Sequence, residues 1–319
     1  MEILKIGVVM DPIETINIHK DTTFVLMLEA ERREHEVYYM ELGDLFVRGA
    51  IPEAHCRRVS VVRGTPHYRF GAAFLKTLSW FDVILMRKDP PFDMNFFFAT
   101  HLLSLVNKRC LVANHPRSLR EASEKLYILN FPEMIPETLV SSDRRQLKQF
   151  MEELGGEMII KPLDGHGGSG VFYLHHQDKN TNALLETATM DGRKPIMAQR
   201  YLPEIREGDK RILVLNGEPI GAVLRVPRDD EIRGNIHVGG QCVKTELTSR
   251  DREICRVLSR HLKALGLYFV GLDVIGDYLT EVNVTSPTGV QEINALEHVR
   301  LESRIIDFIE QKVAELRKT

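Results

Sequence analysis

A lysine followed closely by glycines forms the stretch of this chain best suited to chemistry. An apolar run ends at Lys161, and Gly165, Gly167, Gly168 and Gly170 follow soon after it. Glycine carries no Cβ, so backbone N–H groups in such a segment can approach an anion closely, and the lysine adds a full positive charge. The arrangement predicts a site for a nucleotide polyphosphate, with residues 164–170 forming a flexible flap over the phosphates.

Two other glycine motifs must be weighed against this flap. Residues 165–170 satisfy G-x-G-x-x-G, but that dinucleotide-binding fingerprint opens a helix. Here β-branched and aromatic residues follow at 171–174, so the glycines are expected to join two strands of a hairpin. A Walker loop is excluded because no Gly-Lys-Ser/Thr closes the segment. A mobile surface loop remains the alternative on this stretch alone.

Three side chains with oxygen atoms in the C-terminal part predict a metal site: Asp273, Glu281 and Asn283. Glu281 and Asn283 share a face because side chains alternate along a strand. A two-residue turn before them would turn Glu281 away from Asp273, whereas a three-residue loop over 276–278 would pair the two acids, and we favour the loop. Such a trio suits Mg²⁺, which takes one or two carboxylates and adds water and phosphate oxygens. An acid–base pair, or acids that face solvent on an edge strand, remain open alternatives.

Basic residues near a second predicted hairpin could neutralise the charge of a phosphoryl group in transfer. Asn216-Gly217 is typical of a tight hairpin turn, with Arg211 on the strand before it and Arg225 on the strand after it. A plain two-residue turn would put Arg225 on the face opposite Arg211, so Arg225 joins the site only if a bulge shifts the second strand. Arg233, in a predicted catalytic loop at 227–240, and Lys125 are the other cationic candidates.

The first part of the chain alternates short apolar runs with amphipathic stretches. Strands are expected at 5–10, 37–40, 80–86 and 110–113, and helices at 21–33 and 93–107. This alternation predicts a doubly wound, mainly parallel α/β domain over residues 1–122. Ligands of such a sheet bind beyond the carboxyl ends of its strands, where Asp11 and Arg87 lie. Arg87 could hold a substrate carboxylate or form a salt bridge to a nearby aspartate, and residues 48–79 are expected to be an irregular excursion without an assigned role.

The pattern changes from about residue 123, where short strands and helices mix without regular alternation. Strands are expected at 136–141, 196–200, 211–215 and 218–226, and helices at 143–154, 181–190, 249–265 and 300–318. The change predicts a second domain over residues 123–319.

Composition narrows the partners and the compartment. The formal net charge of −3 is spread without basic or acidic blocks, which disfavours nucleic-acid and membrane-surface partners. The four cysteines form no C-x-x-C pair, as expected for reduced thiols in a cytoplasm. There is no signal-peptide pattern, and no apolar stretch reaches the roughly 20 residues that cross a bilayer.

These motifs together resemble the bacterial glutathione synthetases, members of the ATP-grasp family. The likeness rests on residues 161–168, 208–211, 233–235 and 281–288, and in the first domain on 10–12, 16–18 and 86–93. It spans nearly the whole chain. The resemblance implies an N-terminal substrate-binding domain followed by an ATP-grasp fold of two α+β subdomains that clasp the nucleotide.

The resemblance also implies an activity. ATP and Mg²⁺, with Mn²⁺ as a substitute metal, would support the ligation of γ-glutamylcysteine to glycine through an acyl phosphate, giving glutathione, ADP and phosphate. The family further implies a cytoplasmic homo-oligomer, expected to be a tetramer.

Site residues follow by position in the matching motifs. Nucleotide contacts are implied for Lys125, Lys161, Gly165, Gly167, Gly168, Gln199, Arg200, Tyr201, Leu202 and Asp209. Catalytic contacts are implied for Arg211, Arg225 and Arg233, and metal contacts for Asp273, Glu281 and Asn283. Substrate contacts are implied for Asp11, Asn17, Arg87, Asp89, Ser286, Pro287 and Thr288.

The chain departs from the family pattern at two places. Gly289 and Gln291 stand where some members carry a cysteine and an arginine, so no thiol chemistry is expected there. The segment between Gly217 and Arg225 is one residue shorter, which leaves the position of Arg225 open. Another ATP-grasp ligase with a different peptide substrate, or a nucleotide-binding regulator without turnover, are the competing hypotheses.

Overall fold

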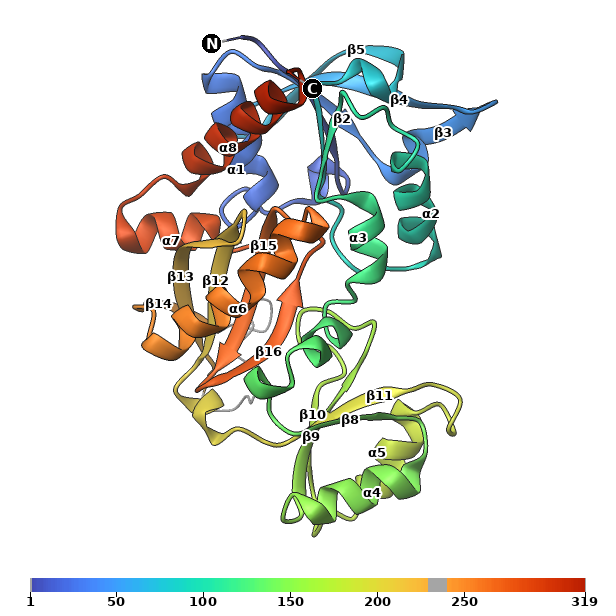
Figure 1. The fold of residues 1–319 in the computed structure, drawn as a ribbon, viewed down its shortest axis with the longest axis vertical. Coiled ribbons are helices and arrows are strands. Elements are labelled where there is room, and N and C mark those ends of the chain that lie inside the picture. Colours follow the sequence, from blue (N-terminus) through green and yellow to red (C-terminus); the bar gives the residue numbers. More distant parts are fainter. Residues whose placement is uncertain (1, 229–239, 319) are drawn as a thin grey trace.

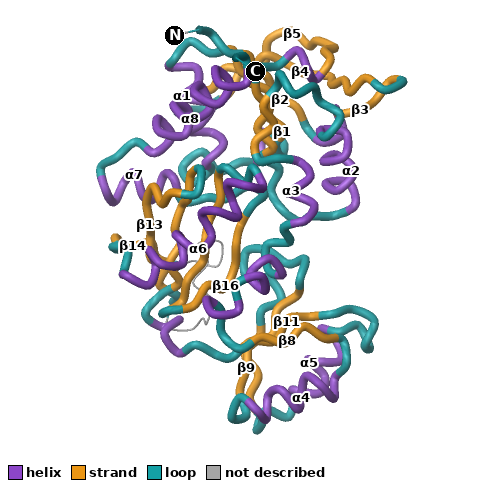
Figure 2. Tube along the Cα trace, viewed as in Figure 1, coloured by secondary structure: helices purple, strands orange, loops and turns teal. Residues whose placement is uncertain are grey.

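The structure, a computed structural model, describes residues 2–228 and 240–318, whose strands form three sheets (Figures 1 and 2). The helices are α1 Thr22–Arg32, α2 Met94–Leu103, α3 Pro116–Glu121, α4 Arg144–Glu153, α5 Thr181–Ala188, α6 Ser249–Leu265, α7 Val290–Glu297 and α8 Leu301–Leu316. The strands are β1 Lys5–Val9, β2 Glu36–Met40, β3 Leu45–Arg48, β4 Ile51–Val61, β5 Tyr68–Thr77, β6 Val83–Met86, β7 Leu111–Ala113, β8 Thr138–Ser141, β9 Glu157–Pro162, β10 Phe172–His175, β11 Ile196–Gln199, β12 Asp209–Leu215, β13 Glu218–Val226, β14 Gln241–Lys244, β15 Phe269–Ile275 and β16 Tyr278–Asn283. None of the helices in this described part of the chain combines the length and apolar character needed to span a bilayer.

The first sheet confirms the predicted doubly wound domain. Strands β2, β1, β6 and β7 are parallel neighbours in that order, and β1 is buried on both faces, as parallel strands covered by helices are. Helices α1 and α8 cover one face, and α2 and α3 cover the other (Figure 1). Asp21 begins α1 by accepting a hydrogen bond from the backbone N–H of Phe24 at 2.5 Å.

Residues 48–79 are regular, so the expectation of an irregular excursion is wrong. Strands β4 and β5 form a long antiparallel hairpin that continues the sheet beyond β2, and β3 pairs with the first part of β4. Most of β5 is exposed. A strand with little burial lacks the polar–apolar alternation that identifies strands in a sequence, because that alternation reflects one buried face.

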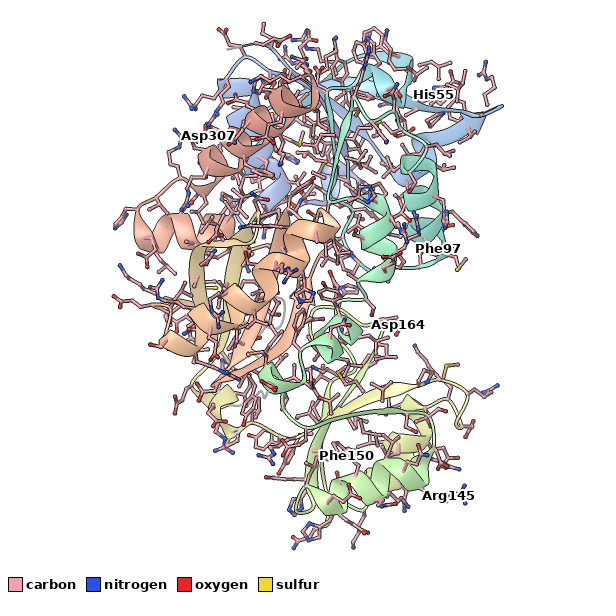
Figure 3. All side chains as sticks on the ribbon, viewed as in Figure 1. His55, Phe97, Arg145, Phe150, Asp164 and Asp307 are labelled. Carbon is pink, nitrogen blue, oxygen red and sulfur yellow. The ribbon has the colours of Figure 1, made fainter. Side chains whose placement is uncertain are left out.

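The second sheet is antiparallel, in the order β10-β9-β11-β8, and packs against α4 and α5 around a small core of its own. Strands β9 and β10 pair with Ile160 opposite Phe172. The glycine-rich segment therefore joins two strands of a hairpin, as predicted. Figure 3 labels Asp164 at the start of this segment and Arg145 and Phe150 on α4 of the same unit.

The third sheet is also antiparallel, in the order β14-β13-β12-β15-β16, and α6 packs on it. A capping box between Thr248 and Asp251 begins α6, and Gly266, in the left-handed conformation, ends it. After α7 the chain returns to the first domain, where α8 lies along α1 (Figure 1). Arg33, which directly follows α1, donates to Asp307 of α8 at 2.6 Å.

Candidate active site

A bulge in the hairpin β12–β13 brings Arg225 into the site. Leu215 pairs with Glu218 across the Asn216-Gly217 turn, as predicted, but the register then shifts so that Ile220 has no opposite residue. Asp209 consequently lies opposite Arg225. Because alternate residues share a face, Arg225 projects on the same side of the sheet as Arg211.

A second bulge pairs the two predicted metal-binding acids. Ile275 pairs with Tyr278 across a two-residue turn, so the expected three-residue loop is wrong. The register shifts at Thr280, however, and Asp273 lies opposite Glu281 as expected, with Asn283 two residues further along the same face. The extra residue of the bulge compensates for the shorter turn.

Asp273 is the centre of a buried ionic network. Its carboxylate accepts from the Arg211 Nε at 2.5 Å and lies 3.1 Å from the Arg225 guanidinium, which also bonds Asp209. Although burial opposes ionisation, the two arginines hold the pKa of Asp273 well below its ordinary range. Gly271 makes room for this network, since a Cβ there would lie 2.9 Å from the Arg211 side chain.

A cavity between the second and third sheets collects every predicted nucleotide contact. All ten residues line it: Lys125, Lys161, Gly165, Gly167, Gly168, Gln199, Arg200, Tyr201, Leu202 and Asp209. Lys125 bonds the Gly165 carbonyl and lies 3.0 Å from the Glu281 carboxylate. Lys161 donates to the Thr280 carbonyl at 3.2 Å, and burial lowers the pKa of Lys161 to about 8. The Lys125 ammonium thus lies beside a flap glycine, and Lys161 lines the same cavity.

A second, polar cavity collects most of the predicted substrate contacts. Asp11, Asn17, Asp89, Ser286 and Thr288 line it, together with Arg211, Arg225 and Asn283. The two cavities share His166, Gly167 and Glu281. A ligand that fills one cavity therefore meets a ligand that fills the other beside the predicted metal residues.

Arg87 and Pro287 are not among the lining residues of the polar cavity. The buried Arg87 donates to the Thr23 hydroxyl at 3.1 Å and to the Pro287 carbonyl at 3.0 Å. It therefore anchors the backbone between Ser286 and Thr288 in this structure. Arg233 and most of the predicted loop 227–240 lie outside the described residues.

The residues at the junction fit a divalent cation. Asp273 lines the nucleotide cavity, Asn283 lines the polar cavity, and Glu281 lines both. Carboxylate and amide oxygens are the donors that hard cations prefer. No group of three or more His, Cys, Asp or Glu side chains in the described residues could hold a metal by itself, so this trio depends on the amide of Asn283 and on ligand oxygens.

Glu292 and Glu124 are among the lining residues that the sequence did not predict. Glu292, in the first turn of α7, lines the polar cavity, and its Oε2 atom is buried without a hydrogen-bond partner. Burial raises the pKa of Glu292. Glu124 lines the same cavity and accepts hydrogen bonds from the backbone N–H groups of Val284 and Thr285 at 2.9 and 3.1 Å. Neither acid belongs to a motif with a recognisable spacing, so the sequence alone does not predict its place in the site.

Solved structures define the class of this fold. The D-cycloserine synthetase DcsG superposes with a TM-score of 0.68 at 14% identity, over 98% of this chain and 99% of that one. The ATP-grasp ligase PsnB in complex with a minimal precursor superposes with a TM-score of 0.64 at 18% identity, over 98% and 99% of the two chains. At these identities the likeness establishes the fold, which is that of the ATP-grasp ligases.

Sequence comparisons define the family. The models of the prokaryotic glutathione synthetase N-terminal domain and ATP-grasp domain match residues 4–120 and 124–298. A glutathione synthetase of Gloeobacter violaceus is 49% identical over 313 residues, covering 96% of each chain. One of Escherichia coli O157:H7 is 45% identical over 313 residues, covering 97% of this chain and 99% of its own. The chain therefore belongs to the prokaryotic glutathione synthetase family.

Proposed function

We propose that this protein is an ATP-dependent ligase that joins γ-glutamylcysteine to glycine. The observation that carries the proposal is the junction at Glu281, where the nucleotide cavity meets a polar cavity beside two arginines. A bisubstrate phosphoryl transfer needs this arrangement, because the γ-phosphate of ATP must lie against the carboxylate that attacks it.

In the first step, a carboxylate oxygen of the cysteinyl residue attacks the γ-phosphorus of ATP. The bond from that phosphorus to the bridging oxygen breaks, and ADP leaves with the electron pair. Lys125 and Lys161 face the phosphates, and Arg211 and Arg225 stabilise the charge of the transferred group. The bound cation, which we propose is Mg²⁺ with Mn²⁺ as a substitute, would be held by Asp273, Glu281 and Asn283 and would neutralise phosphate charge.

In the second step, the glycine amine attacks the carbonyl carbon of the acyl phosphate. The C–O bond breaks, inorganic phosphate leaves, and the amine loses a proton to give the amide. Water competes with glycine for the same carbon. The flap over residues 164–170 would cover the intermediate and exclude that water.

The buried, unpartnered oxygen of Glu292 fits the ammonium group of the γ-glutamyl residue. An acceptor that is buried without a donor costs about 1–3 kcal/mol, and a charged ligand that supplies the donor removes that cost. Asp11 and Asp89 line the same cavity and add negative potential. The unpartnered Asp209 Oδ1 in the nucleotide cavity would accept from a nucleotide hydroxyl in the same way.

Phosphate release measured with ATP, Mg²⁺, γ-glutamylcysteine and glycine, omitting each component in turn, tests the proposal. We expect release to require all four. Turnover that ignores γ-glutamylcysteine would instead identify a ligase for another peptide, and absence of turnover with any acceptor would favour a nucleotide-binding regulator. Glutaryl-cysteine, which lacks the ammonium group, tests Glu292, because Glu292→Gln should penalise γ-glutamylcysteine far more than this analogue.

We also propose a division of the chain at residues 122/123, a cytoplasmic location and assembly into a homotetramer. Exposed apolar side chains on β5, Phe74 and Leu75, support self-association. Light scattering measures the mass in solution; a monomeric mass would overturn the assembly. The charge of −3, without basic blocks, supports small-molecule substrates over nucleic-acid or membrane partners.

A further inference from the structure

The turn between β4 and β5, residues 62–67, lies against the segment that forms one wall of the polar cavity. That segment, residues 11–21, contributes Asp11, Thr15, Ile16, Asn17, Lys20 and Asp21 to the cavity lining. We call it the wall segment. It has no strand, and its one short 3-10 helix spans Ile13–Thr15. Besides its own turns, in which the Thr15 N–H donates to the Pro12 carbonyl and the Lys20 N–H to the Asn17 carbonyl, it depends on contacts made by its neighbours.

Side chains outside the cavity hold the wall segment near both of its ends. His67 lies with its Nε2 2.8 Å from the Ile13 carbonyl. Gln291 of α7 donates its amide to the Ile18 carbonyl at 3.0 Å and to the Asp21 carbonyl at 2.7 Å. These three carbonyls are thus fixed by donors from parts of the chain far away in sequence.

The turn and Gln291 are themselves connected. The Arg63 guanidinium donates to the Gln291 Oε1 at 3.0 Å, which orients the amide so that its N–H groups face the wall segment. Arg63 and His67 also pack against the buried ring of Phe24, with centroid distances of 6.0 and 6.1 Å. Arg63, His67 and Gln291 thus form one continuous brace, and none of the three is a lining residue of the cavity.

We propose that this brace is a positioning device that fixes the wall segment and thereby sets the affinity for the γ-glutamyl end of the peptide substrate. The inference rests on the proposed function and gives residues 48–79 a role. The β4–β5 hairpin brings Arg63 to α7 and His67 to the wall segment. Within the described residues, the hydrogen bonds of the brace run to the wall segment and between its own members, so it acts on the peptide and not on ATP.

Gln291→Glu is the sharpest test. The glutamate still accepts from Arg63 but places a carboxylate against the Ile18 and Asp21 carbonyls. We expect the KM for γ-glutamylcysteine to rise about tenfold or more, since two hydrogen bonds are replaced by repulsion. The KM for ATP and kcat should stay within about twofold.

The turn is tested by His67→Leu, which removes one donor and should raise the same KM about fivefold. His67→Gln keeps a side-chain N–H and should restore most of the affinity. Arg69→Gln, at an exposed position on β5 of the same hairpin, is the matched control and should change neither KM.

Hydrogen–deuterium exchange of residues 11–21 gives a readout that does not depend on turnover. Faster exchange confined to this segment in Gln291→Glu is the expected result. Unchanged exchange with an unchanged peptide KM would overturn the brace, as would equal rises in the KM values for ATP and peptide. If the wild-type protein showed no turnover with γ-glutamylcysteine, the proposed function would fail. The exchange result would still show whether the brace fixes residues 11–21.

Discussion

The two walls of the joined nucleotide and polar cavities are built in opposite ways. One wall, which we call the charged wall, lies on β12, β13, β15 and β16, and its side chains bond one another: Asp273 is bonded to Arg211, Arg225 and Asn283. The other wall, which we call the glycine wall, is the glycine-rich turn between β9 and β10. Hydrogen bonds tie this turn to other elements from Lys125 to the Gly165 carbonyl and from Lys194 to Asp164.

The difference separates two requirements of phosphoryl transfer. Charges that stabilise a transition state act best when they are fixed before the reaction, because no reorganisation is then needed. A cover over a reactive intermediate must open for the nucleotide to enter. A buried ionic network meets the first requirement, and a glycine-rich turn with an adaptable backbone meets the second.

Asp273→Asn should break the charged wall and have the largest effect. Arg211 and Arg225 would lose their shared carboxylate while they remain buried. We expect kcat to fall about 10²–10³-fold and the free energy of unfolding to fall by about 3 kcal/mol. Kinetics and urea unfolding measure both. Asp277→Asn, in the exposed turn beside the same strands, is the control and should leave both unchanged.

Glu281→Gln should separate the metal role from the structural role of the charged wall. Its carboxylate is partly accessible and pairs with Lys125, outside the Asp273 network. Activity at a given Mg²⁺ concentration should fall roughly tenfold or more, and the thermal midpoint should not change. A Mg²⁺ titration identical to that of wild type would contradict the metal assignment.

Gly168→Ala should affect the glycine wall alone. Gly168 has φ +79°, a conformation that costs an alanine about 1 kcal/mol. We expect the KM for ATP to rise about fivefold with global stability unchanged, since the strain is confined to a local segment. Gly49→Ala carries the same kind of backbone cost at φ +63° in the β3–β4 turn, and should leave the KM for ATP unchanged.

The pH dependence of ATP binding should show the smallest effect, at the boundary of the two walls. Burial lowers the pKa of Lys161 to about 8, so the ammonium that attracts phosphate is lost as pH rises above that value. The KM for ATP should therefore be flat below pH 8 and increase above it. Lys161→Arg keeps its charge and should flatten the profile; a wild-type KM that stays constant to pH 10 would count against the role of Lys161.

The burial of Lys161 also determines how the free energy of unfolding changes with pH. The folded state holds Lys161 at a lower pKa than the unfolded chain does, so the unfolded state binds more protons between pH 8 and the ordinary lysine range. The contribution of Lys161 to the free energy of unfolding should therefore rise over that window. Lys161→Met, which cannot titrate, should remove this rise.

Local sequence predicted the secondary-structure elements well wherever the residue types favour a single backbone conformation. Asn216-Gly217 predicted a tight turn because both residues tolerate positive φ, and the structure has 49° and 77° there. The glycines after Lys161 predicted a hairpin because β-branched and aromatic residues follow them. All ten residues for which the family resemblance implies nucleotide contacts line one cavity, but that prediction came from matching motifs and not from local conformational preference.

Registers were predicted less well. The turn before Glu281 has two residues, not three, and Asp273 meets Glu281 only because Thr280 is the extra residue of a bulge. The hairpin β4–β5 was missed because its exposed strand has no alternating pattern. A bulge or an edge strand is stabilised by its neighbours, and those neighbours are distant in the chain.

By itself, then, the sequence determined which groups are available: a lysine with flap glycines, three oxygen ligands and a set of arginines. The tertiary structure decided which of them meet. The bulge at Ile220 places Arg225 on the same face as Arg211. Folding also places Glu292, with its unpartnered oxygen, at the polar cavity and brings Arg63 into contact with Gln291. The physical reason is that composition and local backbone preference act over a few residues, whereas facing, pairing and desolvation depend on contacts that only the folded chain brings together.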